Sequence, residues 1–320
     1  MVIAVTLSLL FGPQLASAPP AASPQHVGPV QKVERLGRGT LVTLWLDTAP
    51  FPAETGPYTD STVLVWIPDH YRGLRGPDVD ILLHFHGHSS TAARALKLTR
   101  VAQQLEASGR FAVLVLPQLA LEARDSSAGK LEERGGVRRM LHAVMGALGR
   151  KRVRRALRSH GPLPRRARPG RVMVSAHSGG FQGASLAVRH GQVNVVEVYL
   201  FDALYGYNHR FIRWLRREPT HRLVTIHRGT GTVAKWTEKL KKSLTKRKLG
   251  YVEETIEGTL SSSALSAGRT IISQTDIPHA RVVFESNALR DCLRGSPLGG
   301  LPDNFRRNKT APRVINISID

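Results

Sequence analysis

Apolar runs of strand length alternate with segments of helical spacing along most of this sequence. The strand-like runs are short and largely uninterrupted, which is typical of strands buried on both faces. They cover residues 40–46, 62–67, 81–85, 111–116, 171–174, 195–201, 223–226 and 269–273. Between them, helical spacing covers residues 92–105, 137–148, 180–188, 211–215, 233–244 and 282–293. This alternation predicts an α/β domain with a mostly parallel central sheet and helices on both faces.

The first two runs differ from the later ones. Residues 40–46 and 62–67 alternate β-branched and other side chains, and turn-forming residues stand between them. No helical spacing separates the two runs, so we expect an antiparallel pair at the start of the sheet.

The N-terminus reads as an export signal. Residues 2–11 form an apolar run of the length of a signal-peptide core, and the small triplet Ala16-Ser17-Ala18 follows a Gly-Pro break. We therefore expect a signal peptide over residues 1–22, a Pro/Ala-rich linker over 23–38 and one α/β domain over 39–320, in a secreted or periplasmic protein. Because the leader carries no Lys or Arg, a disordered apolar leader is the alternative.

Composition excludes several classes. Hydrophobic residues make up 41% of the 320 residues, which is enough for a large core. Beyond the leader no apolar stretch is long enough to span a membrane, so we expect no transmembrane segment in the mature chain. The single cysteine, Cys292, excludes an internal disulfide framework and a thiolate zinc cluster.

The chain is strongly basic, with 46 Lys and Arg against 24 Asp and Glu and a net charge of +22. Residues 150–171 and 235–248 concentrate this charge, and only Trp236 in them could stack on a base. Nucleic acid is therefore an unlikely partner. The charge predicts attraction to an anionic envelope polymer, and a merely solvated basic surface is the alternative.

One serine stands where a nucleophile would. Ser178 follows an apolar strand, precedes a helical segment and is flanked by small residues in Ala176-His-Ser-Gly179-Gly180. A nucleophile on a tight strand-to-helix turn needs such neighbours, because the turn is strained and the adjacent elements come close. The same turn leaves the Gly179 backbone N–H free at a helix start, where developing negative charge is favoured.

A second segment, Ile81-Leu-Leu-His84-Phe-His86-Gly87-His88, ends a strand in His-Gly ahead of that serine turn. Together these features resemble the α/β-hydrolase superfamily, of the serine esterase and lipase kind. The resemblance covers the chain from about residue 40 and implies that the backbone of His88 supplies the second oxyanion N–H, with Gly87 allowing close approach.

The resemblance also implies where the base and the acid lie. The base follows the last strand, where His279 stands, and His227 is the reserve candidate. The loop after residues 223–226, the usual place of the acid, has no carboxylate. We therefore expect the acid to be Asp202, at the end of the preceding strand, a position that a minority of the superfamily uses. Four other carboxylates remain as alternatives: Asp276, Glu253, Glu254 and Glu257.

The three histidines of the second segment have a rival interpretation. Period-two spacing places His84, His86 and His88 on one face of an extended segment, where they could gather a metal ion. Ser89 and Ser90 stand where a metallo-β-lactamase-like site would need an Asp-His pair, so we expect no metal and no cofactor.

These observations predict an exported serine hydrolase that cleaves a small-molecule or polymer-attached carboxylic ester. Ser178, His279 and Asp202 would act as the triad, with Gly179 and His88 binding the oxyanion. An amidase or peptidase would use the same residues. A non-catalytic binder of anionic polymers on a hydrolase scaffold is the alternative from another class.

Overall fold

The computed structural model describes residues 28–52, 55–73, 76–158, 161–256 and 268–301. Ten strands form a single sheet in the spatial order β1-β2-β3-β5-β4-β6-β7-β8-β10-β9. Their bounds are β1 Val30–Arg35, β2 Gly39–Trp45, β3 Thr62–Pro68, β4 Asp78–Phe85, β5 Val113–Pro117, β6 Arg168–His177, β7 Asn194–Phe201, β8 Arg222–His227, β9 Val252–Ile256 and β10 Thr270–Thr275. The strands from β1 to β5 pair antiparallel along this order, and all pairs from β5 to β9 are parallel.

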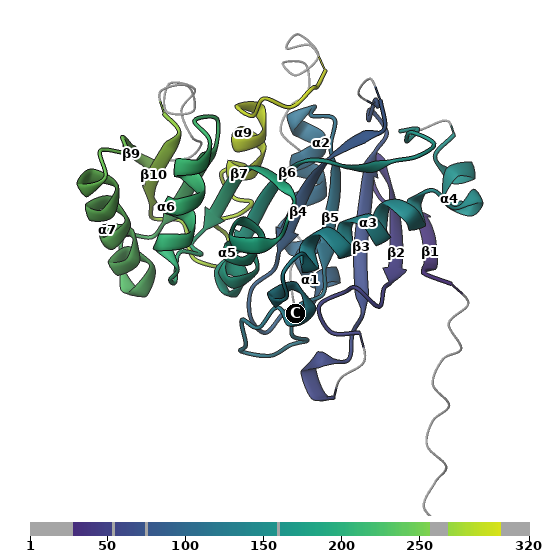
Figure 1. Cartoon of the computed structure of the whole chain (residues 1–320), viewed down its shortest axis with the longest axis horizontal. Helices are drawn as coiled ribbons and strands as arrows, with labels where there is room; N and C mark the ends of the chain where they lie inside the picture. The colour runs from purple at the N-terminus through teal and green to yellow at the C-terminus, as the bar shows by residue number, and fades with distance from the viewer. Residues whose placement is uncertain (1–27, 53–54, 74–75, 159–160, 257–267, 302–320) are drawn as a thin grey trace, which may run out of the picture.

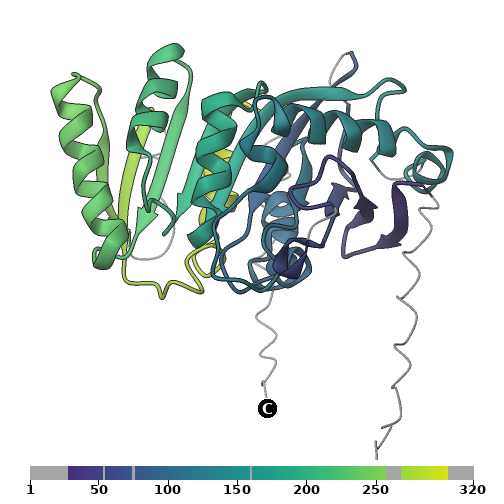
Figure 2. The ribbon, with the colours of Figure 1, turned by 60° about the horizontal axis from the view of Figure 1, so that its bottom comes forward.

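Helices cover both faces of the sheet, as Figure 1 and the turned view in Figure 2 show. On one face lie α3 Gly136–Leu148, α5 Phe181–His190, α6 Asn208–Arg217 and α7 Gly231–Lys246; on the other lie α1 Ala92–Leu98, α2 Val101–Ser108 and α9 Ala288–Arg294. The short helix α4 Lys151–Ala156 follows α3. None of the helices in the described ranges combines the length and apolarity needed to cross a bilayer.

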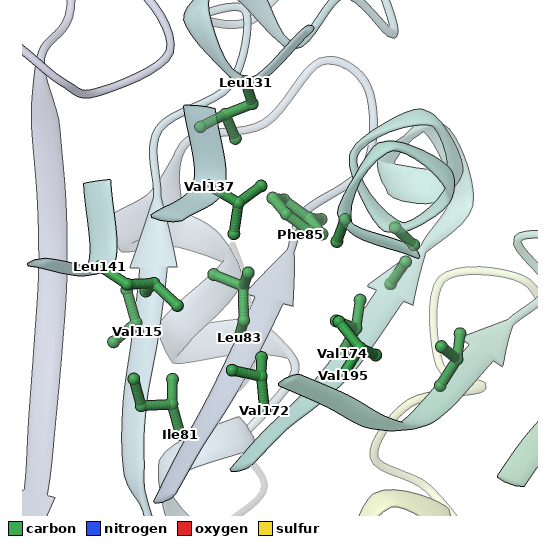
Figure 3. Packing of buried hydrophobic residues seen from close by; sticks show 14 of the residues in the cluster. Ile81, Leu83, Phe85, Val115, Leu131, Val137, Leu141, Val172, Val174 and Val195 are labelled. Carbon is green, nitrogen blue, oxygen red and sulfur yellow. The ribbon is translucent and has the colours of Figure 1, made fainter. Parts of the chain in front are cut away.

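The central strands are apolar on both faces because each face has its own core. In β4, Ile81, Leu83 and Phe85 pack under α3 and α5, while Leu82 between them packs with the opposite helices. Figure 3 shows the core on the α3 and α5 face, around Phe85 and Val174. Two-sided burial therefore explains why these strands read as continuous apolar runs.

One arginine, just after the end of α2, holds the end of α9 and the segment that follows it. The Arg110 guanidinium donates to the carbonyl oxygens of Leu293 (2.9 Å), Leu298 (2.6 Å) and Arg294. The Phe111 N–H also donates to the Gly299 carbonyl at 2.8 Å. These bonds, called the Arg110 clamp below, hold residues 293–299, which follow the loop after β10.

Four details differ from the sequence-based expectations. Residues 30–35, expected in the linker over 23–38, form the edge strand β1. The helix expected over 92–105 is two helices, because Arg100 adopts a left-handed conformation with φ of 52°. The last helix starts at Ala288 rather than 282, after turns and a left-handed Asn287. The sequence also did not predict β9, at the other sheet edge.

The proposed signal peptide, residues 1–22, lies outside the described residues. The basic segments fall on α4 with the loop after it and on α7.

Candidate active site

Ser178 lies on a tight turn between β6 and α5, where a short 3₁₀ turn spans Ser178–Gly180. Its φ is +50°, a left-handed conformation that costs energy for any residue with a Cβ. The space around it is equally tight, since a Cβ on Gly179 would overlap the His88 ring and one on Gly180 the Phe85 carbonyl. The small neighbours are thus required by the close approach of β4 and α5.

We expect Gly180→Ala to lower the free energy of unfolding by about 1–3 kcal/mol, because the added methyl group meets backbone that cannot move aside. The matched control is Gly146→Ala on α3, where a Cβ would meet nothing within 4 Å. It should gain about 0.5–1 kcal/mol from helix propensity. Urea unfolding of the three proteins measures both values. Equal stability of Gly180→Ala and the parent would contradict the close approach.

The structure brings Ser178, His279 and Asp202 into one hydrogen-bonded chain. His279 Nε2 lies 2.9 Å from Ser178 Oγ, and His279 Nδ1 lies 2.6 Å from Asp202 Oδ2. The Asp202 side chain is buried, 8% exposed, and His279 is partly exposed at 36%. A buried carboxylate on Nδ1 favours the tautomer in which Nε2 is free to accept a proton.

The alternative acids and the reserve base lie elsewhere. Asp276 is exposed, and Glu253 pairs with Lys241. Glu254 is on the edge strand β9, and Glu257 lies outside the described residues. The reserve base His227 accepts the Gly229 N–H through Nδ1 at 3.0 Å. Of the candidate carboxylates, the one hydrogen-bonded to His279 in the described part of the chain is therefore that of Asp202.

His86 holds the peptide that precedes the predicted oxyanion donor. Its Nε2 accepts the Leu119 N–H at 3.0 Å, so the ring hydrogen is on Nδ1, which donates to the Gly87 carbonyl at 2.8 Å. In a trans peptide the carbonyl and the next N–H point in opposite directions. The bond to Gly87 therefore turns the His88 N–H away from His86.

His177 fixes the loop that carries His279. Its Nε2 donates to the His279 carbonyl at 2.9 Å, and the two rings lie 4.8 Å apart. Burial lowers the pKa of His177 to about 4, so the ring is neutral at pH 7. Sequence reasoning missed the roles of His86 and His177. Their only signal was the number of histidines next to Gly87 and Ser178.

The three histidines of the metal interpretation have separate partners. His84 Nδ1 lies 3.0 Å from Ser175 Oγ, both His86 nitrogens are engaged as described, and His88 Nε2 lies 2.6 Å from Ser126 Oγ. Within the residues that the structure describes, no three His, Cys, Asp or Glu side chains are grouped to hold a metal ion.

Folding stability should depend on pH through His84. Burial lowers the pKa of this ring to about 3, against about 6.5 in an unfolded chain. Between these values only the unfolded chain binds the proton, so stability falls as pH decreases. We expect His84 alone to contribute a loss of about 1.4 kcal/mol per pH unit below roughly pH 6.

Urea unfolding of the parent and of His84→Gln between pH 7 and pH 4.5 measures this effect. The variant should be less stable at pH 7 but should show a shallower pH dependence, by about one proton. His177 contributes to the remaining slope in both proteins with the same sign. Equal slopes would show that His84 is protonated in the folded state.

Comparison with known proteins gives structural matches only. No family model and no curated sequence matches the chain. A feruloyl esterase module from Clostridium thermocellum, solved with sinapinate, shares 8% identity over 81% of this chain and 88% of its own, with a TM-score of 0.48. An S-formylglutathione hydrolase from Agrobacterium tumefaciens shares 13% sequence identity over 85% of this chain and 100% of its own, with a TM-score of 0.42.

The fold itself is identified by this chain's own connections. An antiparallel start leads into a parallel sheet, the strand that ends just before Ser178 is central, and helices cover both faces. Ser178, Asp202 and His279 follow in this chain order, the first two directly after β6 and β7 and the third in the loop after β10. The chain has the α/β-hydrolase fold, as its sequence predicted.

Proposed function

We propose that this protein is an exported serine hydrolase that cleaves a carboxylic ester through an acyl-enzyme. The observation that carries the proposal is the hydrogen-bonded chain from Ser178 Oγ through His279 to the buried Asp202. A serine, a histidine that can take its proton and a carboxylate that orients the histidine are the parts that acyl transfer needs.

In the proposed reaction Ser178 Oγ attacks the ester carbonyl while His279 Nε2 takes its proton. Asp202 stabilises the imidazolium that forms and does not itself become protonated. His279 then returns the proton to the departing alcohol. In the second half-reaction a water molecule, activated by the same histidine, releases the acid from Ser178.

The negative charge on the carbonyl oxygen would be held by the backbone N–H groups of Gly179 and His88. Gly179 belongs to the first turn of a helix, whose leading N–H groups have no intrahelical acceptor. His86 supports the second donor, since its bond to Gly87 fixes the peptide whose N–H belongs to His88. Donors fixed in advance of the reaction stabilise the transition state without reorganisation.

The direct test is a fluorophosphonate probe, which reacts with an activated serine. We expect stoichiometric labelling and a mass increase on the peptide that contains Ser178, with parallel loss of 4-nitrophenyl acetate hydrolysis. A protein that stays unlabelled but binds a polyanion in a salt-sensitive manner would instead be a binder on a hydrolase scaffold. Parallel ester and amide substrates distinguish an esterase from an amidase.

The basic surface belongs to the proposal as an adsorption surface for an anionic envelope polymer. On α7, Lys235, Lys239 and Lys246 are exposed, while Lys241 is neutralised by Glu238 and Glu253. Attraction of this kind is screened within about 8–10 Å at moderate ionic strength. It would concentrate the protein near its substrate without changing the chemistry.

A further inference from the structure

A hollow of about 670 Å³ lies between the start of α5, the loop before α6, and α7. Aromatic rings and two lysines define its walls: Phe181, Tyr205, Tyr207, Trp236, Lys239 and Lys242. We call it the aromatic hollow.

The aromatic hollow adjoins the serine turn. The Tyr205 side chain lies near the side chain of Ser178, and Phe181 lies three residues after Ser178 at the start of α5. A molecule in the hollow would therefore reach the reacting serine along the Tyr205 side chain.

The aromatic walls are gathered in one place and are partly exposed. All four rings of the hollow are only partly buried, whereas Trp66, Tyr199 and Phe211 in the core are fully buried. Four partly exposed rings gathered in one concavity are typical of a ligand site rather than of a core.

The rings are held in place by the surrounding elements. Phe181 lies 5.6 Å from Tyr205 and 5.8 Å from Tyr207, between centroids, and stacks on Tyr207. The Asn208 amide donates to the Trp236 carbonyl at 2.8 Å, which fixes α7 against the start of α6. The walls are thus ordered before a ligand arrives, which lowers the entropy cost of binding.

The charge of the hollow has one sign. Lys239 Nζ lies 4.3 Å from the centre of the Trp236 ring, and Lys242 is exposed at the rim. No Asp or Glu is among the described residues that line the hollow. A ligand with a flat apolar body and an anionic end would contact the rings with the first and the lysines with the second.

We propose that the aromatic hollow binds an aromatic, negatively charged portion of the ester substrate. This inference rests on the proposed function, because it assigns the substrate class of the same site. It restricts the substrates to esters in which an aromatic ring system carries a carboxylate or a similar anion.

Binding is tested without turnover, on the Ser178→Ala background, by calorimetry at low ionic strength. The probes are 2-naphthoate and its neutral counterpart 2-naphthalenemethanol. We expect naphthoate to bind roughly five- to tenfold more tightly than the alcohol, because two cations face its carboxylate. Trp236→Ala should weaken both probes about tenfold, since a large aromatic contact is removed.

The matched charge control lies on the same helix. Lys239→Gln with Lys242→Gln should reduce naphthoate binding to the level of the neutral probe. Lys235→Gln with Lys246→Gln removes the same charge from α7 outside the hollow and should leave the preference for naphthoate. If both double variants lose naphthoate binding equally, the attraction is to the basic surface in general, and the proposal is wrong. The proposal is also wrong if Trp236→Ala binds the probes as tightly as the parent.

Kinetics separate this inference from the proposed function. With Ser178 present, Trp236→Ala should lower kcat/KM about tenfold for the monomethyl ester of naphthalene-2,6-dicarboxylic acid and much less for methyl acetate, which has no ring to place in the hollow. If Trp236→Ala hydrolyses both esters at the parent rate, the aromatic hollow is not the substrate site, and the proposed hydrolase function is unaffected. Probe binding in the hollow without hydrolysis of any ester would overturn the proposed function and keep the hollow as a ligand site.

Discussion

Ser178→Ala should abolish ester hydrolysis, with a fall in kcat on the order of 10⁶. The nucleophile and its base act as a unit, so removing the serine removes the covalent route and leaves only binding and the oxyanion donors. Initial rates with 4-nitrophenyl acetate, corrected for spontaneous hydrolysis, measure the loss. The fold should persist, because alanine has the same Cβ as serine at the +50° φ and lacks only the hydroxyl group.

The control is Ser185→Ala on α5, a buried serine seven residues further along the chain. Its hydroxyl bonds to the Gln182 carbonyl and accepts from Arg210, away from His279. Activity should stay within several-fold of the parent. If Ser178→Ala hydrolyses the ester at the parent rate, the nucleophile is elsewhere and the assignment of the triad is wrong.

Asp202→Asn should lower kcat by roughly 10⁴. An amide of the same shape donates to His279 Nδ1 instead of accepting from it, which places the ring hydrogen on Nε2. That nitrogen, 2.9 Å from Ser178 Oγ, can then no longer take the serine proton. Single-turnover acylation by 4-nitrophenyl acetate isolates this step from product release.

Asp276→Asn is the matched control, because Asp276 lies three residues before His279 in the same loop and is exposed. It should cost at most about tenfold, through the stability of the loop. The opposite ranking of the two variants would make Asp276 the acid and Asp202 a structural group at the end of β7.

The elements that the sequence predicted best are those buried on both sides. In β4 and β6 the middle positions, residues 81–83 and 172–174, are apolar in succession, so the pattern alone locates the strands. The two edge strands, β1 and β9, were missed because an edge strand pairs on one side only and tolerates exposed Lys and Glu. Helix breaks at Arg100 and Asn287 were missed for another reason, since apolar spacing continues through both turns.

The site divides in the same way. The small residues around Ser178 are required by one turn and are adjacent in the sequence, so a single sequence is enough to recognise them. Asp202 and His279 were predicted from their places in the chain order, which resembles that of the α/β-hydrolase superfamily. The hydrogen bonds of His86 and His177 join segments far apart in the chain, to Leu119 and to the His279 carbonyl. Such pairings depend on tertiary packing, which composition and periodicity do not encode.

The Arg110 clamp has a consequence for heat inactivation. His279, the proposed general base, lies on the loop that begins at the end of β10. The segment after this loop is held by Arg110, which follows α2, through the carbonyls of Leu293 and Leu298. Undocking of that segment is a local opening that leaves the central strands and Ser178 in place. We therefore expect ester hydrolysis to fail at the temperature at which the C-terminal segment is released, below the temperature at which the sheet melts.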